Sequence, residues 1–307
     1  MLSVLLALPW ALLILAITIS TLKHGPFGRI EASSSQTTSV AEANRALAQR
    51  NWLTVGVGLV ALAVMLTIGT IYAPLDSDRT LALAPLTAAI SSIVVIAIRP
   101  LSSITESNDS RSADIIQRRL WHFAPAWMIA AAALILAGSI AVFILLGTMA
   151  DADGMSISRR TARSEKSWDP FPGFFYAVPI IAAIVVLGIV VAIALARITN
   201  APRPTAPPLA EVDSATRFHA IKLALKIGVG AVVYTSGIWL IHAGGGSRHL
   251  GEGIPEFMDP DPSLLALGKL LLIAGWVSQL VGIAFAVWAG KDALKDPVVA
   301  KQSLLQK

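Results

Sequence analysis

The chain lacks cysteine and is poor in charge. None of its 307 residues is a cysteine, which excludes disulfides, thiolate metal sites and cysteine nucleophiles. Asp, Glu, Lys and Arg together make up 14% of the chain, whereas a soluble domain typically carries about a quarter. Hydrophobic residues make up 55%, and the mean hydropathy is +0.70. This deficit in charge is expected if lipid, rather than water, covers most of the surface.

Seven apolar runs are long enough to cross a bilayer. A hydrocarbon core of about 30 Å needs roughly 20 helical residues, and helices are required because unpaired backbone groups are costly in lipid. The expected spans lie at residues 2–20, 52–72, 81–98, 123–149, 175–196, 223–242 and 264–288. We therefore predict an all-α integral membrane protein with a single polytopic membrane domain and no separate soluble domain.

The spans predict one N-terminal helix followed by three helical hairpins. The run at 2–20 resembles a secretory signal, but Lys23 and Arg29 follow it and no Lys or Arg precedes it, which favours a retained helix. Pro74 and the acidic residues after it predict a turn at 73–80. The glycine-rich stretch after His242 predicts a flexible loop before the last span.

The distribution of Lys and Arg predicts the orientation. Most of the 24 cations fall in segments on one side of the expected spans, and the positive-inside rule makes that side cytoplasmic. The N-terminus is then outside and the C-terminus inside. The segment 149–173 dissents, because it places Arg159, Arg160, Arg163 and Lys166 outside. We expect a multi-pass protein of the plasma membrane, and the short loops favour the cytoplasmic membrane of a bacterium.

Three cytoplasmic lead-in segments resemble one another. They are 45–52, 114–121 and 217–222, and each contains a basic residue next to a span. One interpretation is a duplicated hairpin, and the other is the ordinary composition of any helix that enters a membrane from the cytoplasm. In both cases we expect the cations at the headgroup level, where they can meet anionic lipid.

Few polar residues fall inside the expected spans, and none of them is Asp or Glu. That absence disfavours proton-coupled transport and intramembrane acid–base hydrolysis, because both commonly use a buried carboxylate. The candidate functional residues are Lys269 and Gln279 in the last span. Lys269 is expected either to extend toward Asp259 and Asp261 or to lie in a cavity that faces the sixth span. Gln279 is expected to serve helix packing, and Lys226 to extend toward the inner boundary.

No motif in the loops identifies a catalytic residue, a cofactor or a metal. The segment after the sixth span contains imidazoles and carboxylates, which are suitable ligands for a divalent cation. The competing interpretation is a linker in which Asp261 or Ser263 caps the last helix. Asp151 and Asp153 are expected to form a turn rather than a calcium loop.

Three functions remain open. A non-catalytic membrane component, or partner of a larger assembly, is favoured because no nucleotide motif or soluble catalytic domain is present. The alternatives are an autonomous small-molecule transporter and, more remotely, a membrane-embedded enzyme acting on lipid. The expected partners are the bilayer and a membrane or cytoplasmic protein. Nucleic acid is not expected, because the positive charges lie beside membrane spans.

Overall fold

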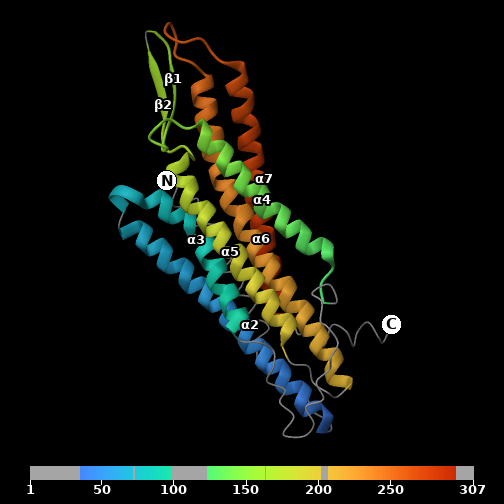
Figure 1. Cartoon of the computed structure of the whole chain (residues 1–307). Helices are drawn as coiled ribbons and strands as arrows, with labels where there is room; N and C mark the ends of the chain where they lie inside the picture. Colours follow the sequence, from blue (N-terminus) through green and yellow to red (C-terminus); the bar gives the residue numbers. More distant parts are fainter. Residues whose placement is uncertain (1–34, 72, 99–122, 163, 202–206, 295–307) are drawn as a thin grey trace.

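The computed structural model describes residues 35–71, 73–98, 123–162, 164–201 and 207–294 (Figure 1). The expected first span at 2–20 and the lead-in segment 114–121 lie outside these residues. The elements are α2 (Ser35–Ile71), α3 (Ala73–Ile98), α4 (Ala126–Met149), β1 (Ile157–Arg160), β2 (Glu165–Trp168), α5 (Phe174–Asn200), α6 (Pro207–Gly251) and α7 (Pro262–Leu294). Within this part of the chain, six helices are long and apolar enough to cross a membrane. The predicted helical architecture is confirmed at that level.

Two predicted loops are helical instead. The turn expected at 73–80 is wrong, because α3 begins at Ala73. Proline and aspartate are favoured in the first turn of a helix as well as in turns, so the sequence signal was ambiguous. The flexible loop expected after His242 is also wrong, because α6 continues to Gly251.

Helix α6 lies at the centre of the bundle. It contacts α3, α4, α5 and α7, and 78% of its apolar stretch is buried, compared with 11% for α7. The outer helices expose large aliphatic side chains, such as Val60 on α2, Leu134 on α4, Ile189 on α5 and Leu280 on α7. This distribution fits a bundle whose outer helices face lipid.

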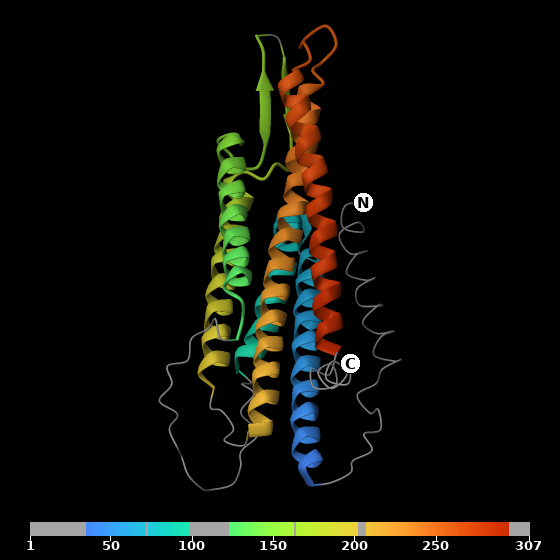
Figure 2. The same cartoon turned by 90° about the vertical axis from the view of Figure 1, so that its right-hand side faces the viewer.

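Helices that follow one another in sequence pack side by side to different degrees. Helix α2 packs along α3, and α6 packs along α7 over most of their length, whereas α4 divides its contacts between α5 and α6. Figure 2 shows α6 and α7 side by side, with α4 and α5 together at the left. Helix α3 packs against α2, α5 and α6. The helical hairpin of α4 and α5 is therefore less closely packed than those of α2 with α3 and of α6 with α7.

The α6–α7 pair projects beyond the other helices at one end. With 45 residues, α6 is about 68 Å long, more than twice the hydrocarbon thickness of about 30 Å. We call the part formed by residues 243–268 the tip. Strands β1 and β2 form an antiparallel hairpin that stands beside the tip (Figure 1). We call the end of the bundle that carries the tip and the β-hairpin the hairpin end. We call the opposite end, where α7 ends, the basic end.

Candidate functional site

A row of glycines brings the main chains of α6 and α7 into contact. The glycines recur at every seventh position on both helices. Those on α6 are Gly230, Gly237, Gly244 and Gly251, and those on α7 that face them are Gly268, Gly275 and Gly282. We call this row the glycine seam. A Cβ atom built at Gly237 would lie 2.8 Å from both the amide nitrogen of Gln279 and the carbonyl oxygen of Gly275. Only glycine allows so close an approach, and small residues are a common means of packing helices in membranes.

The seam also explains why α6 does not end at His242. Glycine disfavours helix by about 1 kcal/mol relative to alanine, so the run Gly244–Gly246 looks like a linker in isolation. In the structure, however, a Cβ at Gly244 would meet the Leu272 nitrogen at 2.6 Å, and one at Gly246 would meet the Trp168 ring at 2.7 Å. Tertiary packing on two sides therefore outweighs the low helix propensity. The seven-residue period was present in the sequence and is the signal that could have revealed this.

A cavity of about 110 Å³ lies between α2, α3, α6 and α7 and is partly open to the surface. Its walls are mostly small apolar side chains, with Thr54, Ser92 and Tyr234 among the few polar ones. Thr54 uses its hydroxyl to donate to the carbonyl of Arg50, at 2.9 Å. An apolar cavity of about 150 Å³ can take up benzene, so this one has room for a short hydrocarbon segment. It is too small and too apolar for a hydrated solute.

Cations outnumber carboxylates among the described side chains at the basic end. The carboxylates are Asp213 and Asp292, and the cations are Arg50, Arg197, Arg217, Lys222, Lys226 and Lys291. Arg217 is fully buried, and its guanidinium donates to Asp213 at 2.8 Å and to the carbonyl of Ile198 at 2.6 Å. It thereby satisfies a C-terminal carbonyl of α5 and joins α5 to α6.

Lys226 pairs with a carboxylate instead of extending to the boundary alone. Its Nζ lies 2.5 Å from Asp292 and 4.7 Å from the centre of the Trp288 ring. Lys222 lies 3.7 Å from the same carboxylate. The sequence analysis missed this partner, because α7 continues past residue 288 and places Asp292 opposite α6.

Arg50 is buried without a carboxylate. Its side chain is 4% exposed, and its Nη2 makes one long hydrogen bond of 3.4 Å to the side chain of Asn51. Within the part of the chain that the structure describes, neither Nε nor Nη1 has a partner. Asn51 in turn donates to the carbonyl of Ala293 at 3.0 Å, which joins α2 to the end of α7. A buried, unsatisfied guanidinium is costly, so Arg50 requires an explanation.

His219 presents a second unsatisfied group at the same end. Its ring hydrogen-bonds to the backbone of Asp292 and lies within electrostatic range of Arg50, while its Nε2 is buried without a partner. Of the lead-in cations, Arg50 and Arg217 are both buried within the bundle, and their position at the headgroup level stays a prediction. The corresponding cations of 114–121 lie outside the described residues.

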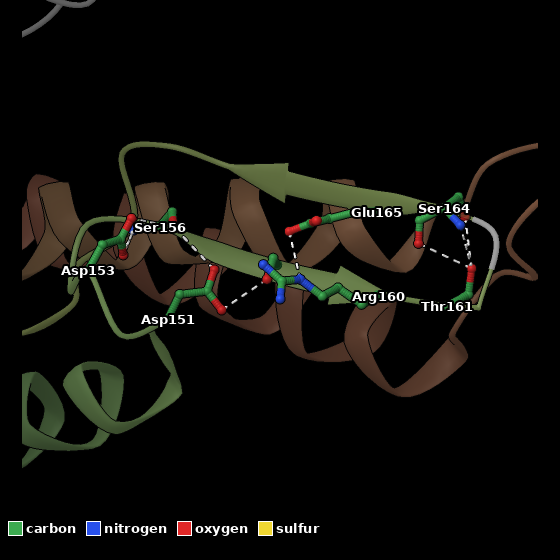
Figure 3. A network of polar contacts seen from close by, with 8 residues as sticks. Asp151, Asp153, Ser156, Arg160, Thr161, Ser164 and Glu165 are labelled. Carbon is green, nitrogen blue, oxygen red and sulfur yellow. Dashed lines mark hydrogen bonds and ion pairs between the residues drawn. The ribbon is translucent and has the colours of Figure 1, made fainter.

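The β-hairpin is bonded to the tip by its cations. Arg159 donates to the carbonyl of Asp259 at 2.9 Å, and Lys166 donates to that of Gly253 at 2.7 Å. Arg160 pairs with Glu165 across the hairpin at 2.8 Å (Figure 3). These contacts give three of the four cations that dissent from the charge rule a structural role; the fourth, Arg163, lies outside the described residues. Trp168 completes the contact by packing on Gly246 and lying 5.1 Å from the His249 ring.

Hydrogen bonds between residues close in sequence fix the turns beside the β-hairpin and at the start of α7. Asp153 accepts from the amides of Met155 and Ser156 and from the Ser156 hydroxyl (Figure 3). These bonds, first among them the one from Met155, hold the pKa of Asp153 below its ordinary value. At the start of α7, Asp261 accepts from Ser263 and Leu264, which likewise lowers its pKa. The predicted turn and the predicted cap are both confirmed.

The possible metal ligands of the segment after His242 are separated. His242 lies 5.4 Å from the Trp239 ring, His249 stacks on Trp168, and Glu252 pairs with Arg248 at 3.0 Å. Across the described residues, no three of His, Asp and Glu gather as a metal site would require. The described geometry therefore gives the divalent-cation interpretation of this segment no support.

The two candidate residues of the last span lie apart from the cavity. Lys269 is exposed and follows Gly268, which packs on Gly244 near the base of the tip. Gln279 is half-buried and packs against Gly237 in the glycine seam. Neither residue lines the cavity. The structure thus places Gln279 in helix packing and leaves Lys269 away from the enclosed space that one interpretation required.

The fold defines a class, namely a helical bundle with several membrane-length helices and one projecting helix pair. Comparisons with protein families, with curated proteins and with solved structures gave no match. The assignment of function therefore depends on the geometry of the chain.

Proposed function

We propose that the chain is a non-catalytic component of a larger membrane assembly. The observation that carries this proposal is the position of its ionisable groups, which lie toward the ends of the described membrane-length helices. On α6 no Asp, Glu, Lys or Arg lies between Lys226 and Arg248, on α7 none lies between Lys269 and Lys291, and α4 has none. The middle of the described bundle therefore carries no Asp, Glu, Lys or Arg.

Contacts within the chain account for most of these groups. Arg217 is engaged with Asp213, Lys226 with Asp292 and Arg197 with the carbonyl of Ala97. The pair of Lys226 with Asp292 and the bond from Arg197 to Ala97 each join two helices, whereas Arg217 and Asp213 both lie on α6. All are ordinary structural features. Their positions support a stable scaffold rather than a substrate path.

The glycine seam further disfavours an autonomous transporter. Alternating access needs helices or bundles that move against each other around a binding site. The main chains of α6 and α7 are in direct contact from Gly230 to Gly251, and the cavity beside them is apolar and small. A fixed helix pair that projects from the bundle is better suited to contacting another protein.

We infer that the hairpin end is outside and the basic end is cytoplasmic. Arg159 and Lys166 of the β-hairpin are bonded to the tip, and most of the other described cations lie at the basic end, which the positive-inside rule makes cytoplasmic. The absence of native cysteine makes a labelling test direct. Glu165→Cys at the hairpin and Gln49→Cys on α2 both replace exposed residues. In intact cells, a membrane-impermeant maleimide should label the first, and should label the second only after permeabilisation. The opposite pattern would contradict the orientation.

The component proposal is tested by gentle solubilisation of tagged protein from its native membrane, followed by identification of the proteins that co-purify. We expect a second polypeptide that is absent from a control preparation of an unrelated, identically tagged membrane protein. A particle that contains this chain alone and catalyses saturable solute uptake in liposomes would favour the transporter instead.

A further inference from the structure

Arg50, whose guanidinium is unsatisfied among the described residues, lies one helical turn along α2 from Thr54, which lines the apolar cavity. Arg50, Thr54, Gly58 and Leu62 recur at four-residue intervals and so share one face of α2, and the last three of them line the cavity. Ala293, whose carbonyl binds the neighbouring Asn51, lines the same cavity from α7. A charged group and an apolar space are therefore adjacent, with the charge on the side of the basic end.

We propose that this place binds one anionic phospholipid, with its phosphate on Arg50 and part of an acyl chain in the cavity. This site goes beyond the scaffold role and does not depend on it. It assigns a ligand to two features, the orphaned guanidinium and the cavity, that the scaffold role leaves unexplained.

The chemistry of Arg50 fits a phosphate. Among the described residues its Nε and Nη1 are free, and its Nη2 holds only the 3.4 Å bond to Asn51. Nη2 together with either of the other two nitrogens forms the planar fork that binds phosphate oxygens in a bidentate manner. The buried Nε2 of His219 supplies a further polar group at the same end. Burial strengthens such charge-assisted bonds, because water does not compete for the donors.

The protein does not provide this anion itself among its described side chains. Asp292 is already held by Lys226 and Lys222, and Asp213 is held by Arg217. Arg50 makes no ion pair with either carboxylate. Among the described side chains, Arg50 is thus left without a carboxylate, and an anionic ligand would supply the negative charge.

The adjoining surfaces favour a lipid over a free phosphate ion. The cavity is partly open and lined mostly by apolar side chains, and the neighbouring surface of α2 exposes Leu53, Val57 and Val60. A hydrocarbon chain that leaves the cavity would lie along this surface and contact its apolar side chains. A free phosphate would make no use of either feature.

The test uses the purified full-length chain, delipidated in a mild detergent and titrated while bound lipid is counted by native mass spectrometry. The probes are dioleoylphosphatidylglycerol, dioleoylphosphatidylcholine and glycerol phosphate. We expect the wild-type chain to bind the anionic lipid about tenfold more tightly than the zwitterionic one, and glycerol phosphate far more weakly than either.

Two variants separate the contribution of the lipid headgroup to binding from that of the acyl chain. Arg50→Gln should reduce the affinity for the anionic lipid about tenfold, to that of the zwitterionic lipid. Ala289→Leu fills part of the cavity wall and should weaken both lipids while leaving the preference for the anionic one. The matched control is Lys291→Gln, which removes an exposed cation from the same end of α7 and should leave both affinities unchanged.

Folding of the Arg50 variant is checked by its melting temperature without lipid. Because the substitution removes an unpaired buried charge, this temperature should not fall, whereas the upward shift on adding anionic lipid should be lost. Equal affinity of wild-type and Arg50→Gln protein for the anionic lipid would overturn the proposal. Binding of glycerol phosphate as tight as that of the lipid would overturn the assignment to lipid.

Discussion

Replacing Gly244 by alanine places a methyl group against the backbone of α7. The new Cβ would lie 2.6 Å from the Leu272 nitrogen and 2.8 Å from the Gly268 carbonyl oxygen. Ordinary contact begins near 3.4 Å, so the two helices must separate locally by about 0.8 Å. Backbone atoms cannot rotate away as a side chain can, and the separation therefore affects the neighbouring rows of the seam.

The expected cost is an overpacking penalty of about 1–3 kcal/mol. It is offset by about 0.5–1 kcal/mol, because alanine is the better helix former. The free energy of unfolding of Gly244→Ala should therefore fall by about 1–2 kcal/mol. Reversible unfolding of the purified protein in mixed micelles measures this difference, provided that the transition is two-state.

The adjacent residue provides the control. A Cβ at Gly245 meets only the Trp168 ring, at an ordinary 3.6 Å, so Gly245→Ala should leave stability unchanged or raise it by about 0.5 kcal/mol. If the segment were a flexible linker, the two substitutions would act alike. Equal stability of the two variants would refute both the glycine seam and the helical tip.

Three further predictions concern the two ends of the bundle. Asp292→Asn leaves Lys226 without its partner and should lower the free energy of unfolding by about 2 kcal/mol, whereas Glu252→Gln, at the exposed pair with Arg248, should change it by less than about 0.5 kcal/mol. Trp168→Ala should speed amide exchange of residues 157–168, because the hairpin loses its contact with Gly246; Trp127→Ala, at a side chain that is 70% exposed, should not. The carboxyls of Asp153 and Asp261 have pKa values below their ordinary ones, so the stability they contribute is complete above the unfolded pKa of about 4 and is lost as the pH falls through the folded values. Amide exchange of the turns at 153–156 and 261–264, corrected for its intrinsic pH dependence, should be constant from pH 7 to about 5 and rise below about 4; a rise already at neutral pH would contradict this assignment.

Local features of the fold were predictable from the sequence. The described membrane-length helices follow from the lengths of apolar runs, because the bilayer thickness fixes how many residues a span needs. The cap at Asp261 and the turn at Asp153 depend on hydrogen bonds within a few residues, so residue type and position suffice to suggest them.

Features that depend on helix register were not predictable in the same way. The partner of Lys226 is 66 residues away, and the bond from Asn51 to Ala293 spans 242 residues. Each requires knowing how far α7 extends and which face it turns toward the bundle. The helical tip is a similar case, because Gly244 is stabilised by packing on α7 against its own low propensity.

The proposal that the chain is a component of a larger assembly is tested most directly by the molar ratio of co-purified polypeptide to this chain. We would measure that ratio by absolute quantification after solubilisation from the native membrane in two different mild detergents. The account predicts one polypeptide at the same simple ratio in both detergents. A preparation in which no second polypeptide reaches a constant ratio would contradict it.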